Sequence, residues 1–79
     1  MQNSNLEILE EIFKEVFELQ DTSEHSEITQ EKIKKWDSLA HISLIVAVES
    51  EFDISIDAAD YELFTSFLSV KSILEGLKL

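Results

Sequence analysis

The sequence predicts a small all-α protein: a four-helix bundle of three longer helices and a short third helix, with a long first loop. Apolar residues recur at spacings of three and four, which places them on one face of a helix. The chain has no proline and a single glycine, Gly76, which suits helices joined by polar loops. Its 79 residues, 44% of them apolar, allow one domain over residues 1–79 with a small core.

The first helix is expected from about residue 5 to residue 19, with Ser4 or Asn5 as its cap. Its apolar face consists of Leu6, Leu9, Ile12, Phe13, Val16 and Phe17. The following stretch, residues 21–35, is rich in Ser, Thr and Glu, and we interpret it as a long ordered loop whose two isoleucines anchor it to the core.

The second helix is expected over residues 38–51, with Asp37 or Ser38 as its cap. Its apolar positions are Leu39, Ile42, Leu44, Ile45, Val46 and Val48. Because these surround much of the helix, we expect it to be central in the bundle. Residues 52–56 are interpreted as an extended turn. The short third helix is expected from Asp57, and the fourth over residues 69–78 with Ser69 as its cap.

The composition limits the partners of the chain. Its 17 acidic and 6 basic residues give a net charge of −11, which argues against nucleic acid and anionic membranes and favours basic protein surfaces. No apolar run approaches the ~20 residues of a membrane span, so no membrane insertion is expected. The first residues lack the pattern of a signal peptide. The absence of cysteine fits a cytoplasmic protein without disulfides.

Ser38 is the candidate functional residue, because it directly precedes the apolar positions of the second helix. A serine at a helix start can be exposed and rigidly held, and the unpaired N–H groups there favour an anion. Taken alone, Asp37 and Ser38 are more simply helix caps. A catalytic pair of Ser38 with His41 lacks a third orienting group, so an exposed histidine is the simpler interpretation. No dedicated metal site is expected, because Glu49, Glu51 and Asp53 lack the glycine and the spacing of a calcium loop.

About residues 33–77 resemble acyl carrier and peptidyl carrier proteins. The resemblance rests on the run Asp37-Ser38-Leu39, on the apolar residues Ile42, Leu44, Ile45 and Val48 after it, and on the exit over residues 49–56. The resemblance implies a non-catalytic carrier in which Ser38 bears a 4'-phosphopantetheine arm, attached by a phosphopantetheinyl transferase from coenzyme A. By the same resemblance, Asp37 helps the transferase to position metal and coenzyme A. Leu39 is expected to anchor the first turn of the second helix to the core and to be recognised by partner enzymes.

The chain departs from the family pattern at Trp36, where many carriers have glycine. Trp36 is expected to shield the base of the arm or contact a partner, or else only to cover the loop. The outward positions of the second helix lack the acids of fatty-acid carriers, and hold Ala40, His41, Ser43, Ala47 and Ser50. The length of residues 58–68 is similar to that of D-alanyl carrier proteins.

These features predict a monomeric, stand-alone carrier of acyl or aminoacyl thioesters, served by one dedicated ligase or transferase. Trp36, His41 and Ile42 are the expected partner contacts. The alternative is an acidic helical interaction module that never carries a prosthetic group. A third interpretation, a small hydrolase using Ser38 and His41, needs a pocket that so short a chain can scarcely enclose.

Overall fold

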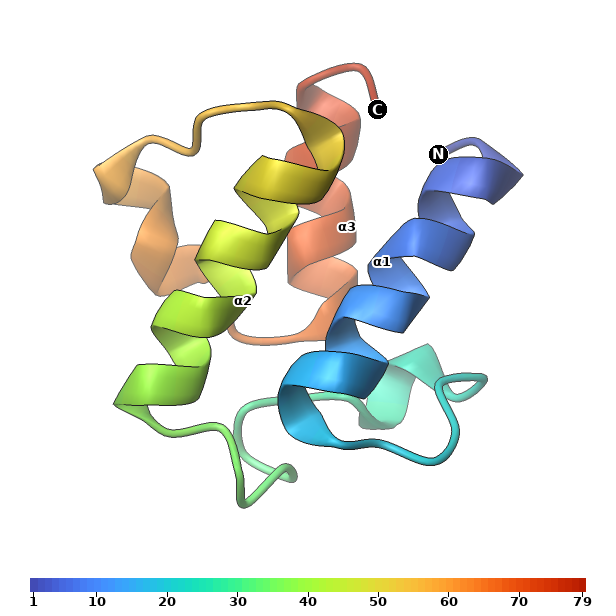
Figure 1. Cartoon of the computed structure of the whole chain (residues 1–79), viewed down its shortest axis with the longest axis vertical. Helices are drawn as coiled ribbons and strands as arrows, with labels where there is room; N and C mark the ends of the chain where they lie inside the picture. The colour runs from blue at the N-terminus through green and yellow to red at the C-terminus, as the bar shows by residue number, and fades with distance from the viewer.

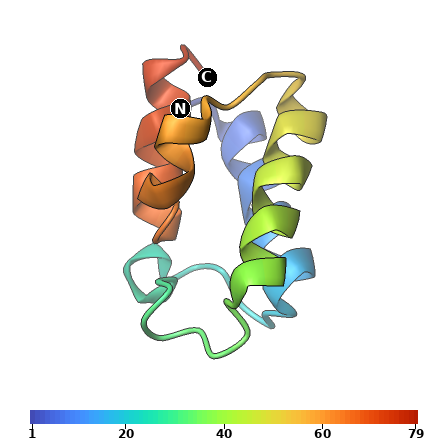
Figure 2. The ribbon, with the colours of Figure 1, turned by 90° about the vertical axis from the view of Figure 1, so that its left-hand side faces the viewer.

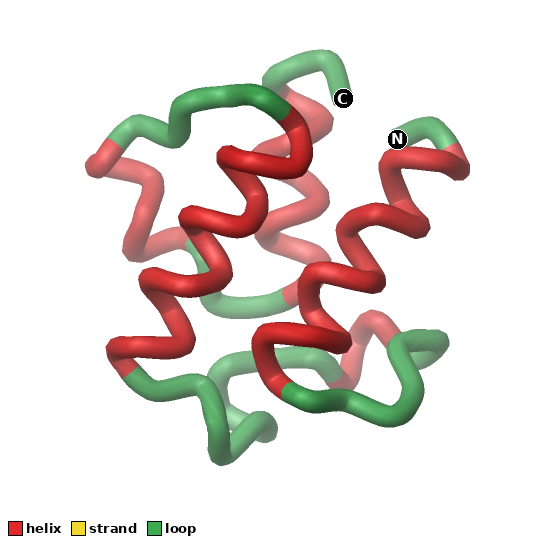
Figure 3. The backbone as a smooth tube through the Cα atoms, in the orientation of Figure 1, coloured by secondary structure: helices red, strands yellow, loops and turns green.

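The computed structural model describes the whole chain, Met1–Leu79, and consists of helices and the segments that join them (Figures 1 and 3). In chain order the elements are α1 (Asn3–Phe17), the 3-10 helix η1 (His25–Glu27), α2 (Ser38–Phe52), the 3-10 helix η2 (Ala58–Leu63) and α3 (Phe67–Gly76). No strand is present, and the single isolated β-bridge joins Thr29 to Ser66. The predicted all-α class is therefore confirmed.

The three α-helices enclose the core between them. In Figure 1, α1 and α2 lie side by side and run in opposite directions, with α3 behind them. Figure 2 shows η2 on the side of α3, across from α2. The α1–α2 connection, residues 18–37, crosses one end of the bundle and holds η1 against α3, while both chain termini lie at the other end (Figure 1). Near the end of this connection, Trp36 packs against Phe13 and Phe17 of α1.

Aromatic rings form the centre of the core. Phe13, Phe17, Phe64 and Phe67 are at most 1% exposed, and the rings of Phe13 and Phe67 lie 5.0 Å apart. The other fully buried side chains are Leu9, Leu44, Leu74, Val48 and Val70. Each α-helix contributes to this set, so burial of apolar area holds all three together.

The bounds of α1 differ from the expected ones by two residues at each end. The helix begins at Asn3, because the N–H of Leu6 already donates to the carbonyl of Gln2, and no side chain caps it. It ends at Phe17, because Glu18 adopts a left-handed conformation with φ of 54°. The predicted cap at Ser4 or Asn5 was therefore wrong.

The start of α3 was also predicted two residues late. Ser66, not Ser69, is the N-cap: its Oγ accepts from the N–H of Ser69 at 3.0 Å. The Oγ of Ser69 accepts from the N–H of Ser66 at 3.1 Å in return. This reciprocal pair is a capping box, with serine in the place of the usual acid.

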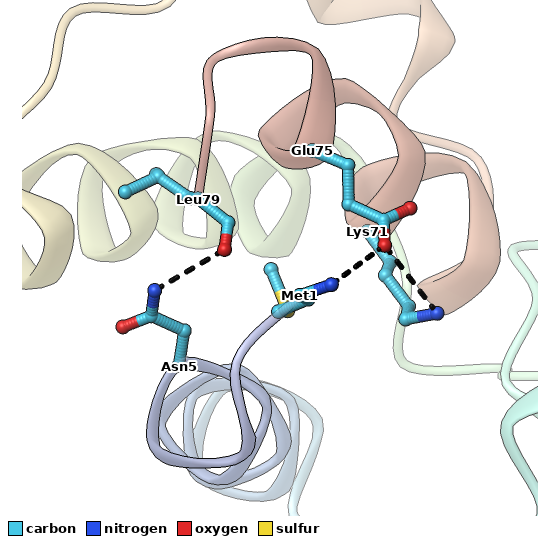
Figure 4. Close-up of polar contacts among 5 residues, drawn as sticks. All are labelled: Met1, Asn5, Lys71, Glu75 and Leu79. Atoms are coloured by element: carbon cyan, nitrogen blue, oxygen red, sulfur yellow. Dashed lines mark hydrogen bonds and ion pairs between the residues drawn. The ribbon is translucent and has the colours of Figure 1, made fainter.

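A polar contact joins the two ends of the chain (Figure 4). The α-amino group of Met1 donates to the Glu75 carboxylate at 2.9 Å, and Lys71 lies 3.8 Å from the same oxygen. Asn5 donates to the carbonyl of Leu79 at 3.3 Å. These contacts, here called the terminal clasp, bind the beginning of α1 to the end of α3.

Candidate functional site

Ser38 is the first residue of α2, and its side chain is exposed. The capping role belongs to Asp37, whose carboxylate accepts from the N–H of Ala40 at 2.8 Å. The Asp37 carbonyl accepts from the N–H of His41 at 2.9 Å, which closes the first helical turn. The Ser38 hydroxyl makes no hydrogen bond within the protein, so it is free to react.

Trp36 holds the chain in place two residues before Ser38. Its ring is 5% exposed and stacks on Phe17 with centroids 4.5 Å apart. The edge of Phe13 lies against it at 5.9 Å. Trp36 was predicted as a partner contact, but its ring is part of the core and presents almost no surface. The small exposed part borders the hollow beside Ser38.

His41 is half-buried, not exposed as the sequence suggested. Its Nδ1 accepts from the indole Nε1–H of Trp36 at 3.0 Å, and its Nε2 lies 2.8 Å from the carbonyl oxygen of Tyr61 in η2. Both ring nitrogens are therefore engaged, and neither is free to take the proton of Ser38. A Ser–His hydrolase needs that free nitrogen, so the geometry argues against it.

An open hollow of about 590 Å³ lies beside Ser38. Its walls come from the α1–α2 connection, from the first turn of α2 and from η2, and consist of Gln30, Trp36, Asp37, Ser38, His41, Ile42 and Glu62. The sequence did not point to Gln30 or Glu62. Gln30 belongs to the α1–α2 connection, where its N–H donates to the carbonyl of Thr65 at 2.8 Å. Glu62 is distant in the chain, and the packing of η2 across from α2 brings it to Ser38.

Leu39 does not anchor α2 to the core, as the resemblance implied. It is 77% exposed, and Ile42 and Val46 are 51% and 56% exposed. The buried face of α2 consists of Leu44, Ile45 and Val48. Leu39 and Val46, seven residues apart, share the opposite face. The helix is therefore peripheral rather than central, and Leu39, Ile42 and Val46 form an exposed patch, the apolar stripe.

Two of the three lysines of the α1–α2 connection, Lys32 and Lys35, are paired with acids. Lys35 donates to Glu18 at 2.7 Å, and this hydrogen bond and the charge of Lys35 lower the pKa of the Glu18 carboxyl. Lys32 pairs with Glu27. The carboxylates of Asp37 and Glu62 remain at the edge of the hollow. The surroundings of Ser38 therefore carry little net positive charge.

Two acidic residues at the C-terminal end of α2, Glu49 and Asp53, shape the turn that follows. A Glu49 carboxylate oxygen accepts from the N–H of Ile56 at 2.7 Å, which closes the turn after α2. Asp53 ends α2 with φ of 52°. No group of three or more His, Asp or Glu side chains is arranged to hold a metal ion. None of the helices is both long and apolar enough to cross a bilayer.

Comparison with protein-family models, with curated proteins and with solved structures gives no significant match. Any assignment to a family therefore depends on the residues described above.

Proposed function

We propose that this chain is a carrier domain that holds acyl or aminoacyl cargo as a thioester on a 4'-phosphopantetheine arm attached to Ser38. One observation supports this most strongly. The Ser38 hydroxyl is exposed and unbonded at the start of a packed helix, because Asp37 provides the cap in its place. The resemblance of the D-S-L run to acyl and peptidyl carriers indicates which prosthetic group the serine would bear. The chain would be a substrate of a transferase and not itself an enzyme.

The residues present fit such an arm. Its phosphate is an anion, and the backbone N–H groups of Ser38 and Leu39 have no partner inside the helix. The open hollow leaves room beside the serine. When attached, the arm supplies a thiol that holds the cargo, and the chain has no cysteine that would compete for it. In the attachment reaction the Ser38 oxygen bonds to phosphorus and the pyrophosphate bond of coenzyme A breaks. Adenosine 3',5'-bisphosphate leaves, and the transferase takes the hydroxyl proton.

The apolar stripe is the surface we propose for partner enzymes. Leu39 lies next to Ser38, and Ile42 lies one turn further along and lines the hollow. The stripe carries no charge of its own, so steering of a basic partner toward it is weak. This favours one dedicated ligase or transferase that recognises apolar area. His41 contributes to this surface only through its partly exposed ring edge.

The attachment site is tested by intact mass after incubation with coenzyme A and a phosphopantetheinyl transferase of broad specificity. The wild-type chain should gain one phosphopantetheine, and Ser38→Ala should gain none. Folding of the variant should be nearly unchanged, because the cap at Asp37 is retained. Ser43→Ala, another exposed serine of α2, is the matched control and should be modified normally.

Modification of Ser38→Ala would show that the arm is elsewhere. If the folded wild-type chain gains no mass, the carrier proposal fails. The alternative, an interaction module without a prosthetic group, would then be preferred, since the apolar stripe supports binding in either case.

A further inference from the structure

The imidazole of His41 joins three parts of the molecule. It belongs to α2, it accepts a hydrogen bond from Trp36 of the α1–α2 connection, and it contacts the carbonyl of Tyr61 in η2. An indole N–H can only donate and a carbonyl oxygen can only accept. Nδ1 must therefore be unprotonated and Nε2 must carry the proton. The structure thus requires the neutral ring in one tautomer.

We propose that His41 is a proton-sensitive latch that holds the Trp36–Asp37 segment in the position that presents Ser38. Protonation of Nδ1 removes the acceptor of the indole N–H, while Nε2–H still donates to Tyr61. The latch therefore opens on one side only: Trp36 is released and η2 stays bound. The link to Ser38 presentation rests on the proposed function, whereas the release of Trp36 does not.

The position of Trp36 explains why its release affects Ser38. Its ring is 5% exposed, so an indole N–H without an acceptor is an unpaired polar group in the core. Only Asp37 separates Trp36 from Ser38, and Asp37 is the residue that caps α2. The stacking of Trp36 on Phe17 is unaffected by the proton. The expected result is a looser segment before Ser38, not unfolding.

The groups around His41 allow the charged ring to remain in place. Asp37, before α2, and Glu62, of η2, are the acidic groups that line the hollow with it. The residues of the α1–α2 connection that line the hollow, Gln30 and Trp36, are neutral. Lys35, also in the connection, is paired with Glu18. No charged residue of α1 lines the hollow. A protonated His41 therefore faces two carboxylates and no free cation.

Two substitutions each keep one side of the latch. In His41→Asn, the amide oxygen stands near the place of Nδ1 and can accept from Trp36. In His41→Gln, the amide nitrogen reaches toward the place of Nε2 and can donate to Tyr61. Neither side chain titrates, so the first mimics the closed latch and the second the open one at every pH.

Nuclear magnetic resonance of the indole N–H gives a direct readout, because Trp36 is the only tryptophan. Between about pH 8 and about pH 5.5, where histidine changes charge, the wild-type indole signal should move in step with the ring signals of His41. Over the same range, the rate of indole exchange with water, divided by that of His41→Asn at the same pH, should rise. The indole signal of His41→Asn should not move. His41→Gln should resemble the acidic wild type at both pH values. His25→Asn, the control for the second histidine, should respond as the wild type does.

An indole signal that stays constant while His41 titrates would overturn the latch, and so would the same response in His41→Asn. The effect of the latch on Ser38 is measured as the initial rate of Ser38 modification. This rate is divided by that of His41→Asn at the same pH, which removes the pH dependence of the transferase. For the wild type this ratio should fall about threefold between about pH 8 and about pH 5.5, whatever its value at pH 8, an effect of the size of one hydrogen bond.

A constant ratio together with a moving indole signal would show that the latch does not control Ser38. If no variant is modified at any pH, the proposed function fails, and the indole signal still decides whether the latch exists.

Discussion

Leu39 and Leu44 lie five residues apart in α2 and have opposite environments. Leu44 is fully buried against the aromatic core, whereas Leu39 is 77% exposed next to Ser38. The same residue type therefore stabilises the fold at one position and forms part of a surface at the other. At this scale, the function of a leucine follows from the side of the helix on which it lies.

The contrast predicts two different effects on stability. Leu44→Ala should lower the free energy of unfolding by about 2–5 kcal/mol, because a cavity remains in a packed core. Leu39→Ala should change it by less than about 0.5 kcal/mol. Urea unfolding followed by circular dichroism measures both. A loss above about 1 kcal/mol for Leu39→Ala would mean that this side chain packs in solution.

At the scale of elements, α3 depends on its capping box. Ser66 and Ser69 satisfy each other's N–H groups at the point where the chain leaves η2 and enters the core at Phe67. The N–H of Phe67 donates to the carbonyl of Ile28 at 2.8 Å, which joins this helix start to the α1–α2 connection. The beginning of α3 is thus a junction of three segments.

Ser66→Ala should therefore lower the free energy of unfolding by about 1 kcal/mol, because it removes the cap of α3. Ser72→Ala, at an exposed position within the same helix, is the control and should have an effect near zero. Thermal or urea unfolding of the two variants gives the comparison. Equal losses would show that the capping box contributes nothing specific.

The outward face of α2 gives a prediction about partner choice, which rests on the proposed function. Ser43 and Ser50 are exposed and uncharged, whereas Ala40 is partly buried against the core. Ser43→Glu with Ser50→Glu should improve loading by a general fatty-acid malonyl transferase, since steering requires complementary charge. Ser43→Gln with Ser50→Gln is the uncharged control. Wild-type loading already as fast as that of a fatty-acid carrier would contradict this.

For the whole molecule, the net charge of −11 opposes compactness and the terminal clasp favours it. The hydrogen bond from the Met1 amino group, and then the charge of Lys71, lower the pKa of Glu75 from its ordinary value of 4.5. A lowered pKa in the folded state means that the clasp stabilises above pH 4.5 and that this stabilisation is lost as pH falls through the folded value.

Glu75→Gln should consequently lower stability near neutral pH, and its difference from the wild type should shrink as the pH falls below 4.5. Glu31→Gln is the control, because it removes an equal charge from an exposed residue without an ion pair and so measures how far general charge repulsion is relieved. Melting temperatures across this pH range provide the test. A difference for Glu75→Gln that does not exceed the control at any pH would show that the clasp is not formed in solution.

The sequence by itself determined the helical class, the start of α2 at Ser38, and the inward positions of Phe13 and Phe17. These follow from periodicity and capping preference, which are local properties of the chain. The ends of α1 and α3 could not be predicted as closely. Glu18 ends α1 by a left-handed turn that no glycine marks, and Ser66 and Ser69 are equally good caps until Phe67 is buried.

Only the tertiary structure decided which face of α2 is buried. Apolar residues surround this helix, and the packing of the neighbouring helices determines which of them are buried. The tertiary structure likewise placed Trp36 in the core, Glu62 beside Ser38 and the carbonyl of Tyr61 against His41. The roles of Leu39, Trp36 and His41 arise from contacts between segments far apart in the chain. No pattern within a single segment contains that information.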